Sequence, residues 1–162
     1  MFVQDCGDLF SNAVPSKWID QVLIHCRKYP GNTYLFQSKN PARFIEFSGR
    51  FPEKRILGTT LETNRQNHLS QAPDINDRAH YIRVMKGRGF KVMVSIEPIL
   101  DFDHHQFVQI IKNICPAFVS IGADSKRSAL TEPSPMKLEM LIKELQEFVE
   151  IRLKSNLTRL LG

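Results

Sequence analysis

The sequence predicts an α/β fold, an open partial (βα) barrel of about five or six parallel strands with outer helices, forming a single partial TIM-barrel-like domain over residues 1–162. The main observation is a repeat in which a short apolar run ends in a polar cluster and an amphipathic stretch follows. Near-continuous apolar strands that alternate with helices are typical of parallel sheets, because the crossover helices bury both faces. About five units are too few to close an eight-stranded barrel, so we expect an open arc with an unprotected edge.

Five apolar runs mark the expected strands, at residues 2–4, 34–36, 56–61, 92–96 and 118–122. A turn is expected at residues 150–152. The end of the chain, residues 156–162, fits either a sixth short strand or a helical tail.

Helix signals fall between these runs. An apolar stripe with helical spacing runs from Trp18 to Cys26, and Asn40-Pro41 is a cap with proline at the first helical position. Further helices are expected to begin at Asp74, at Asp103 and at Ser134-Pro135, the last being the longest.

Composition sets broad limits on function. Hydrophobic residues make up 42% of the chain and charged residues 24%, which is ordinary globular composition. The formal net charge of +5 permits contact with nucleic acid, but the cations are spread over all helices and linkers, so a solvated surface is the commoner explanation. No apolar run approaches the ~20 residues of a membrane span, and no secretory leader is seen, so no membrane association and a cytoplasmic location are expected.

Three cysteines, Cys6, Cys26 and Cys115, lie far apart in the chain. Their number and spacing fit neither a disulfide framework nor a CxxC metal site. Cys26 and Cys115 are expected to be small buried hydrophobic residues, whereas Cys6 falls where the first strand ends.

Polar residues directly after the expected strands are the candidate site, because the carboxyl ends of parallel strands share one rim and functional groups gather there. These residues are Asp5, Cys6, Asp8, Gln37, Lys39, Thr60, Glu62, Asn64, Ser95, Glu97, Asp101, Asp124 and Ser125. Glu97 is the sharpest candidate, since it follows a five-residue apolar strand and precedes Pro98. The structural alternative for Glu97 is an ion pair with a rim lysine such as Lys39, and Glu62 could equally cap the following loop.

Other site chemistries have weaker support. His104, His105, Asp101 and Asp103 suggest a metal site, but adjacent histidines at a helix start point to different faces, and Asp103 is explained as a cap. No GxSxG elbow, P-loop or GxGxxG fingerprint occurs. No metal site is therefore predicted.

Four segments in order resemble one family. Gly7-Asp8-Leu9-Phe10, Thr60-Leu61-Glu62-Thr63-Asn64, residues 94–100 (VSIEPIL) and Ile121-Gly122-Ala123-Asp124-Ser125 are similar to the later part of phage-type radical S-adenosylmethionine proteins of unassigned function, distant relatives of spore photoproduct lyase. The resemblance spans essentially the whole chain. It implies a partial barrel that holds S-adenosylmethionine beside a [4Fe-4S] cluster, with Asp8, Thr60, Glu62, Ser95, Glu97 and Gly122 facing the cofactor and Lys39, Asn64 and Asp124 in the substrate pocket.

The chain departs from the family at its cluster motif. The CxxxCxxC loop of the family follows the first strand, and this sequence begins at what would be the second. A cluster needs three thiolates from the protein, which Cys6, Cys26 and Cys115 cannot supply at that spacing. A cluster is therefore expected only if the cysteines come from a missing segment or a second chain.

Two functions remain open from the sequence. One is a radical S-adenosylmethionine-type protein or a fragment of one, which works with an upstream cysteine-bearing segment or a homodimer partner. The alternative is a non-catalytic binding module on a degenerate partial barrel, with nucleic acid among its candidate partners. The substrate is not specified by these residues.

Overall fold

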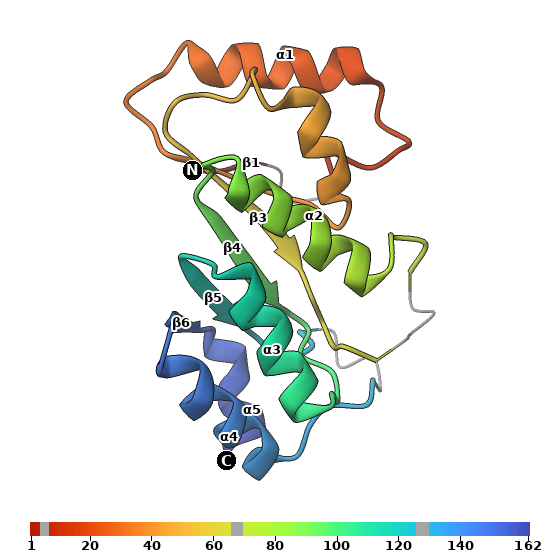
Figure 1. The fold of residues 1–162 in the computed structure, drawn as a ribbon, viewed down its shortest axis with the longest axis vertical. Helices are drawn as coiled ribbons and strands as arrows, with labels where there is room; N and C mark the ends of the chain where they lie inside the picture. The colour runs from red at the N-terminus through yellow and green to blue at the C-terminus, as the bar shows by residue number, and fades with distance from the viewer. Residues whose placement is uncertain (4–6, 66–69, 126–129) are drawn as a thin grey trace.

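The computed structural model describes residues 1–3, 7–65, 70–125 and 130–162. Six parallel strands form one sheet in which each strand pairs with the next along the chain (Figure 1). The strands are β1 (Phe2–Val3), β2 (Tyr34–Gln37), β3 (Arg55–Thr60), β4 (Val92–Ile96), β5 (Phe118–Ile121) and β6 (Glu150–Leu153). β1 and β6 form the two edges of this sheet, so the predicted open α/β fold is confirmed, and the sheet does not close into a barrel.

Helical segments connect successive strands, and the last two of them follow β6. They are α1 (Ser16–Arg27), the 3₁₀ helix η1 (Pro41–Phe47), α2 (Ile75–Gly87), α3 (His104–Ile114), α4 (Pro135–Gln146), the 3₁₀ turn η2 (Ser155–Leu157) and α5 (Thr158–Leu161). Two predicted caps are formed by side chains. Asp74 accepts a hydrogen bond from the Asn76 backbone N–H at 2.8 Å, and Ser134 accepts one from Lys137 at 3.4 Å.

The end of the chain differs from the sequence prediction. Residues 150–152 were expected to form a turn, but they belong to β6, in which Ile151 lies opposite Val119 of β5. Because β6 is an edge strand, no residue in it is buried, and the apolar run that marks the inner strands is missing. The tail that follows is helical, so of the two alternatives for residues 156–162, the helical tail is confirmed.

Two other expected caps use their side chains differently. Asn40 precedes η1, but its amide donates to the backbone oxygen of Phe10 at 3.1 Å and to Oδ1 of Asn12 at 2.9 Å. Asp103 precedes α3, and its carboxylate accepts from Arg65 rather than from the helix. Both side chains therefore connect loops that follow different strands.

An aromatic cluster fills the core beside β2. Phe10 is 1% exposed, and its ring centroid lies 4.7 Å from that of Phe44 in η1. Phe36, Phe47 and Phe51 complete the cluster. Burying such rings stabilises a fold by roughly 1.5–3 kcal/mol each, so this cluster fixes the loop after β1 against η1.

The helix stripes are less fully buried than their spacing predicts. Trp18 begins the apolar stripe predicted up to Cys26, yet it is more than half exposed, as are Met136 and Met140 of α4. Within the described ranges, no helix has both the length and the apolar character needed to cross a membrane.

Candidate functional site at the carboxyl rim

The carboxyl ends of the six strands lie on one edge of the sheet, which we call the carboxyl rim. Thr60 is the last residue of β3 and lies opposite Ser95 of β4, and both are buried. Glu97 directly follows β4, and Gly122 directly follows β5. The strand ends therefore bring polar residues that are far apart in the sequence onto a common edge.

Glu62 lies two residues beyond β3 and is only 7% exposed. One carboxylate oxygen lies 2.5 Å from Nζ of Lys39, and the other lies 2.8 Å from Nη1 of Arg78 on α2. The same Arg78 nitrogen donates to the backbone oxygen of Thr60 at 3.2 Å. A buried charge requires such partners, and Arg78, which sequence reasoning missed, is itself 4% exposed. Its position in the first turn of α2, between the apolar residues Ile75 and Ala79, gave no signal of this role.

Asp8 holds the turn after β1 against the turn after β2. Its Oδ2 accepts the backbone N–H of Lys39 at 2.8 Å, and its Oδ1 accepts that of Phe10 at 3.0 Å. Gln37 donates to Oγ1 of Thr60 at 3.0 Å beside it.

Two adjoining hollows open at this part of the rim, and Asp8 and Lys39 line both. One, of about 290 Å³, is also lined by Phe2, Gly7, Gln37, Ser38 and Thr60. The other, of about 480 Å³, extends toward Asn12, Asn40 and residues 71–73. Three predicted site residues, Asp8, Lys39 and Thr60, thus surround one small polar hollow.

Glu97 belongs to a second cluster, formed by residues that follow β4, β5 and β6. Its carboxylate pairs with Nζ of Lys154 and accepts from the Asn156 amide at 3.3 Å. The predicted alternative was an ion pair with a rim lysine, and the pair exists, but the partner is Lys154 rather than Lys39. Lys154 follows β6, the strand that the sequence pattern did not reveal.

Gly122 is required by this cluster. A Cβ at position 122 would lie 2.7 Å from Oε1 of Glu97 and 3.1 Å from Oδ1 of Asn156. The absence of a side chain therefore lets the Glu97 carboxylate lie against the end of β5.

Asp124 is buried near the same strand end. Its backbone N–H donates to Glu132 at 3.2 Å, and its backbone oxygen accepts from Arg159 at 3.0 Å. The Arg159 guanidinium also pairs with Glu132 and lowers the pKa of that carboxyl. Asp124 thus lies beside an ion pair that ties α5 to the loop after β5.

Asn64 and Asp101 fasten neighbouring rim loops together. Asn64 exchanges hydrogen bonds with the backbone of Asp103, with its amide donating at 3.1 Å and its oxygen accepting at 2.8 Å. Asp101 pairs with Lys137 of α4 at 2.6 Å and with Arg65. Hydrogen bonding from Lys137, with a further contribution from Arg65, lowers the pKa of Asp101.

The histidines of the weaker metal hypothesis are engaged elsewhere. Nε2 of His104 lies 2.6 Å from Glu144 of α4, and Asp103 pairs with Arg65. In the part of the chain that the structure describes, no three histidine, cysteine or acidic side chains are grouped to hold a metal ion.

The cysteines do not meet at the rim. Cys26 is buried near the end of α1, where burial raises the pKa of its thiol. Cys115 follows α3 and is exposed, which corrects the expectation that it is buried. Both lie where helices return to the amino ends of strands, and the predicted rim residues Asp5 and Cys6 lie outside the described residues.

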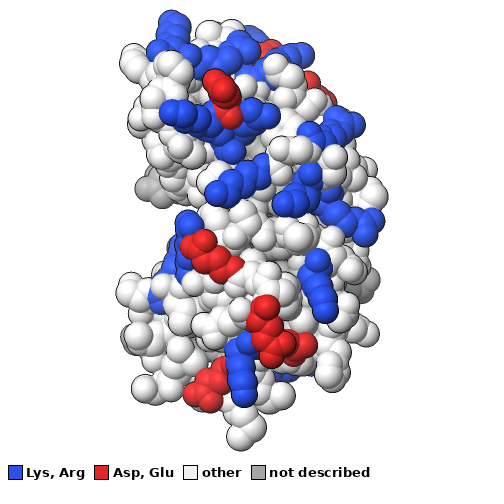
Figure 2. All heavy atoms as spheres, turned by 60° about the vertical axis from the view of Figure 1, so that its left-hand side comes forward, with Lys and Arg blue, Asp and Glu red and all other residues white. Residues whose placement is uncertain are grey.

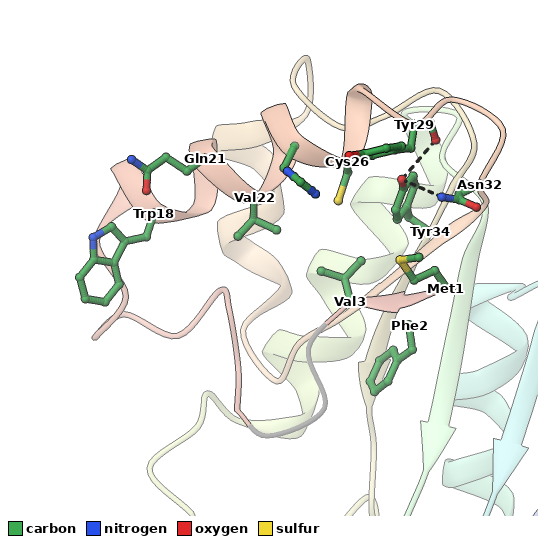
Figure 3. Close-up of a pocket in the computed structure, with 11 residues that line it drawn as sticks. Met1, Phe2, Val3, Trp18, Gln21, Val22, Cys26, Tyr29, Asn32 and Tyr34 are labelled. Atoms are coloured by element: carbon green, nitrogen blue, oxygen red, sulfur yellow. Dashed lines mark hydrogen bonds between the residues drawn. The ribbon is translucent and has the colours of Figure 1, made fainter.

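A larger, apolar groove of about 740 Å³ lies away from the rim, between β1 and α1 (Figure 3). Val3 and Val22 face one another across it, and the Tyr34 hydroxyl donates to the backbone oxygen of Tyr29 at 3.2 Å on its wall. It is mainly a surface of uncovered hydrophobic side chains beside the open edge strand.

Comparison with known proteins agrees with this fold. No family model matches the chain, and no curated protein matches it. A crystal structure of Streptococcus suis SuiB is similar, with a TM-score of 0.64 and 12% sequence identity over 91% of this chain. The match spans 37% of the SuiB chain, so this chain corresponds to well under half of that protein. At this identity the likeness concerns the fold, an open α/β sheet of parallel strands.

Proposed function

We propose that this chain is the later part of a radical S-adenosylmethionine-type barrel and that its carboxyl rim binds S-adenosylmethionine. The observation that carries the proposal is the polar hollow of Asp8, Lys39 and Thr60 at the rim of an open parallel arc. The four family-like segments support it, because each lies at the carboxyl end of a different strand.

The chemistry of the hollow suits a zwitterionic cofactor. Lys39 supplies an ammonium group for a carboxylate, and Asp8 supplies a carboxylate for an ammonium group. Thr60 and Gln37 supply hydroxyl and amide groups of the kind that bind ribose hydroxyls. Lys39 is 38% exposed although it pairs with Glu62, so its ammonium group also faces solvent.

The residues present do not fit an iron–sulfur cluster. Such a cluster needs three protein thiolates on one loop or surface, and the two described cysteines lie at the opposite edge of the sheet from the rim hollow. In this proposal the cluster cysteines belong to another segment or a second chain, and we assign no reaction step to this chain alone.

Calorimetric titration with S-adenosylmethionine tests the proposal. Lys39→Gln should weaken binding at least tenfold, whereas Lys143→Gln, the same change at an exposed site on α4, should not. The family resemblance implies that Glu97, in the separate cluster after β4, also faces the cofactor, so Glu97→Gln should weaken binding as well, with Glu139→Gln on α4 as its control. Absence of binding by the unaltered chain, or equal effects of site and control variants, would contradict the proposal.

Anaerobic reconstitution with iron and sulfide tests the statement about the cluster. The isolated chain should bind less iron than one [4Fe-4S] cluster per molecule. A full cluster absorbance and iron count that depends on Cys6, Cys26 and Cys115 together would show that the chain carries its own cluster site.

A non-catalytic binding module is the second candidate. It is favoured by the extent of internal pairing at the rim, where Glu62, Glu97 and Asp101 each contact two side-chain donors from the chain itself. Such pairing holds strand ends together without a ligand. Failure of S-adenosylmethionine to bind a folded chain would favour this candidate.

A further inference from the structure

The edge opposite the carboxyl rim carries a concentrated positive charge. We use the term basic edge for Arg27, Lys28, Lys54, Arg55, Lys86, Arg88 and Lys91, which lie where helices lead into β2, β3 and β4. Glu53 is the one acidic residue in these connecting segments, residues 27–33, 48–54 and 86–91. The seven cations carry a charge of +7 and the whole chain has a formal net charge of +5, so the remaining residues sum to −2. In Figure 2, Lys and Arg side chains gather over the upper part of the molecule, with few acidic groups among them.

Ion pairing distinguishes the basic edge from the carboxyl rim. At the rim, cations such as Lys39, Arg78 and Lys154 have carboxylate partners. Across the described ranges, the salt bridges include none of the seven basic-edge side chains, although Arg50 in the segment before β3 pairs with Asp20 of α1 at 2.6 Å. Like charges gathered on one face repel one another, and an anionic partner removes this repulsion.

Helix dipoles account for only part of the cluster. Arg27 and Lys86 lie in the last turns of α1 and α2, where a cation is favoured by the helix C-terminus. Lys54, Arg55 and Lys91 instead lie at or immediately before the starts of β3 and β4. The excess charge therefore belongs to the amino ends of β2, β3 and β4 and not to the helix ends alone.

Backbone hydrogen bonds place the amino ends of β2, β3 and β4, which carry three of these cations, side by side. The Tyr34 N–H donates to the backbone oxygen of Lys54 at 2.9 Å, and the Leu57 N–H donates to that of Lys91 at 3.0 Å. The Arg55 guanidinium lies 4.6 Å from the centroid of the Phe90 ring, next to Lys91.

An exposed aromatic ring adjoins the cations. Tyr29 follows Lys28 directly and is 53% exposed, and its ring lies 5.2 Å from that of His25. The Tyr34 hydroxyl fixes the backbone of Tyr29. Cations that follow a phosphate backbone, combined with an exposed aromatic face on which a base can stack, are features of surfaces that bind single strands.

We propose that the basic edge binds single-stranded nucleic acid, with Lys28, Lys54, Arg88 and Lys91 contacting phosphates and Tyr29 stacking on a base. This binding is separate from any ligand at the carboxyl rim. It requires neither a cluster nor S-adenosylmethionine.

Fluorescence anisotropy with a labelled 20-nucleotide oligothymidylate tests the proposal. Lys54→Gln/Arg88→Gln/Lys91→Gln should weaken binding more than tenfold and reduce the slope of log affinity against log salt by about 2, since each phosphate contact on a single strand contributes roughly 0.7. Lys17→Gln/Arg83→Gln/Lys143→Gln removes the same charge from exposed sites elsewhere and should change binding less than threefold. Circular dichroism melting of both triple variants checks that they fold.

Two single substitutions sharpen the assignment. Tyr29→Leu should weaken binding about tenfold while Tyr29→Phe does not, because stacking needs the ring and not the hydroxyl. Glu53→Gln should tighten binding. The proposal is overturned if the chain does not bind the oligonucleotide at low salt, or if the control triple variant loses as much affinity as the basic-edge triple variant. It is also overturned if polyglutamate competes equally well, or if a blunt duplex binds more tightly and Tyr29→Leu does not change its affinity.

Discussion

At the residue scale, the contact between Glu97 and Gly122 leaves little free space at the rim. The two residues follow neighbouring strands, and the carboxylate occupies space that any side chain at position 122 would need. Lys154 and Asn156 hold the carboxylate there from the segment after β6. A change at Gly122 should therefore act through Glu97.

Gly122→Ala should lower the free energy of unfolding by about 1–2 kcal/mol, because overpacking forces the Glu97 side chain away from its partners. Gly49→Ala is the matched control, since nothing lies within 4 Å of a Cβ there. Urea denaturation followed by circular dichroism measures both. Equal urea midpoints for the two variants would show that the Glu97 side chain can move without loss of stability.

The position of Glu97 could be predicted from the sequence, but its partners could not. A carboxylate after an apolar strand has to lie at the strand end, and this places it on the rim. Its partner Lys154 depends on β6, whose partly exposed residues lack an apolar pattern. Arg78 was missed for a similar reason. A helix pattern shows that a residue is polar, but it does not show that the residue pairs with a buried carboxylate.

At the scale of elements, the end of α3 contains a local strain. Cys115 follows the helix with φ of 52°, the left-handed region that favours glycine. Helices commonly end in this conformation, but a side chain there costs about 1 kcal/mol or more.

Cys115→Gly should raise the free energy of unfolding by roughly 0.5–1 kcal/mol, since glycine adopts this conformation without a Cβ clash. Cys115→Ala, which removes the thiol and keeps the Cβ, should not. Thermal melting under reducing conditions compares the two variants. A gain that appears equally in the alanine variant would assign the effect to the thiol instead.

The ion pairs of Asp101 link three elements, because Lys137 belongs to α4 and Arg65 to the loop after β3. The folded-state pKa of Asp101 is lowered, first by hydrogen bonding from Lys137. A lowered carboxyl pKa stabilises the fold at pH above its ordinary value of 3.8, and this stabilisation is lost as pH falls through the folded pKa.

Asp101→Asn should therefore reduce stability near pH 7 and flatten the decline in stability below about pH 4. Glu147→Gln, at an exposed position after α4, should leave the decline unchanged. Urea midpoints measured from pH 3 to pH 7 decide the matter. If the urea midpoint of Asp101→Asn fell toward pH 3 with the same slope as that of the unaltered chain, the role given to this carboxylate would be contradicted.

At the scale of the whole molecule, the fold class was predictable because burial on both faces imposes a repeating apolar pattern on the inner strands. β4 has all five residues buried, whereas the edge strands β1 and β6 have none. The pattern therefore reveals the middle of the sheet better than its edges. The same geometry leaves β1 with an open side, beside the apolar groove under α1.

The open edge of β1 is expected to pair with a second copy of the chain. Phe2 is 50% exposed, and among the described residues β1 pairs only with β2, so its outer side lies open next to uncovered apolar surface. Val3 packs partly against the core, so its replacement has a different consequence. Phe2→Lys should weaken association without loss of stability, whereas Val3→Lys should destabilise the domain.

Met136→Lys, at a 73% exposed position on α4, is the control for added charge. Sedimentation velocity at micromolar concentrations, with urea denaturation for stability, separates these outcomes, and a monomer at every concentration would show that the open edge of β1 does not pair with a second copy.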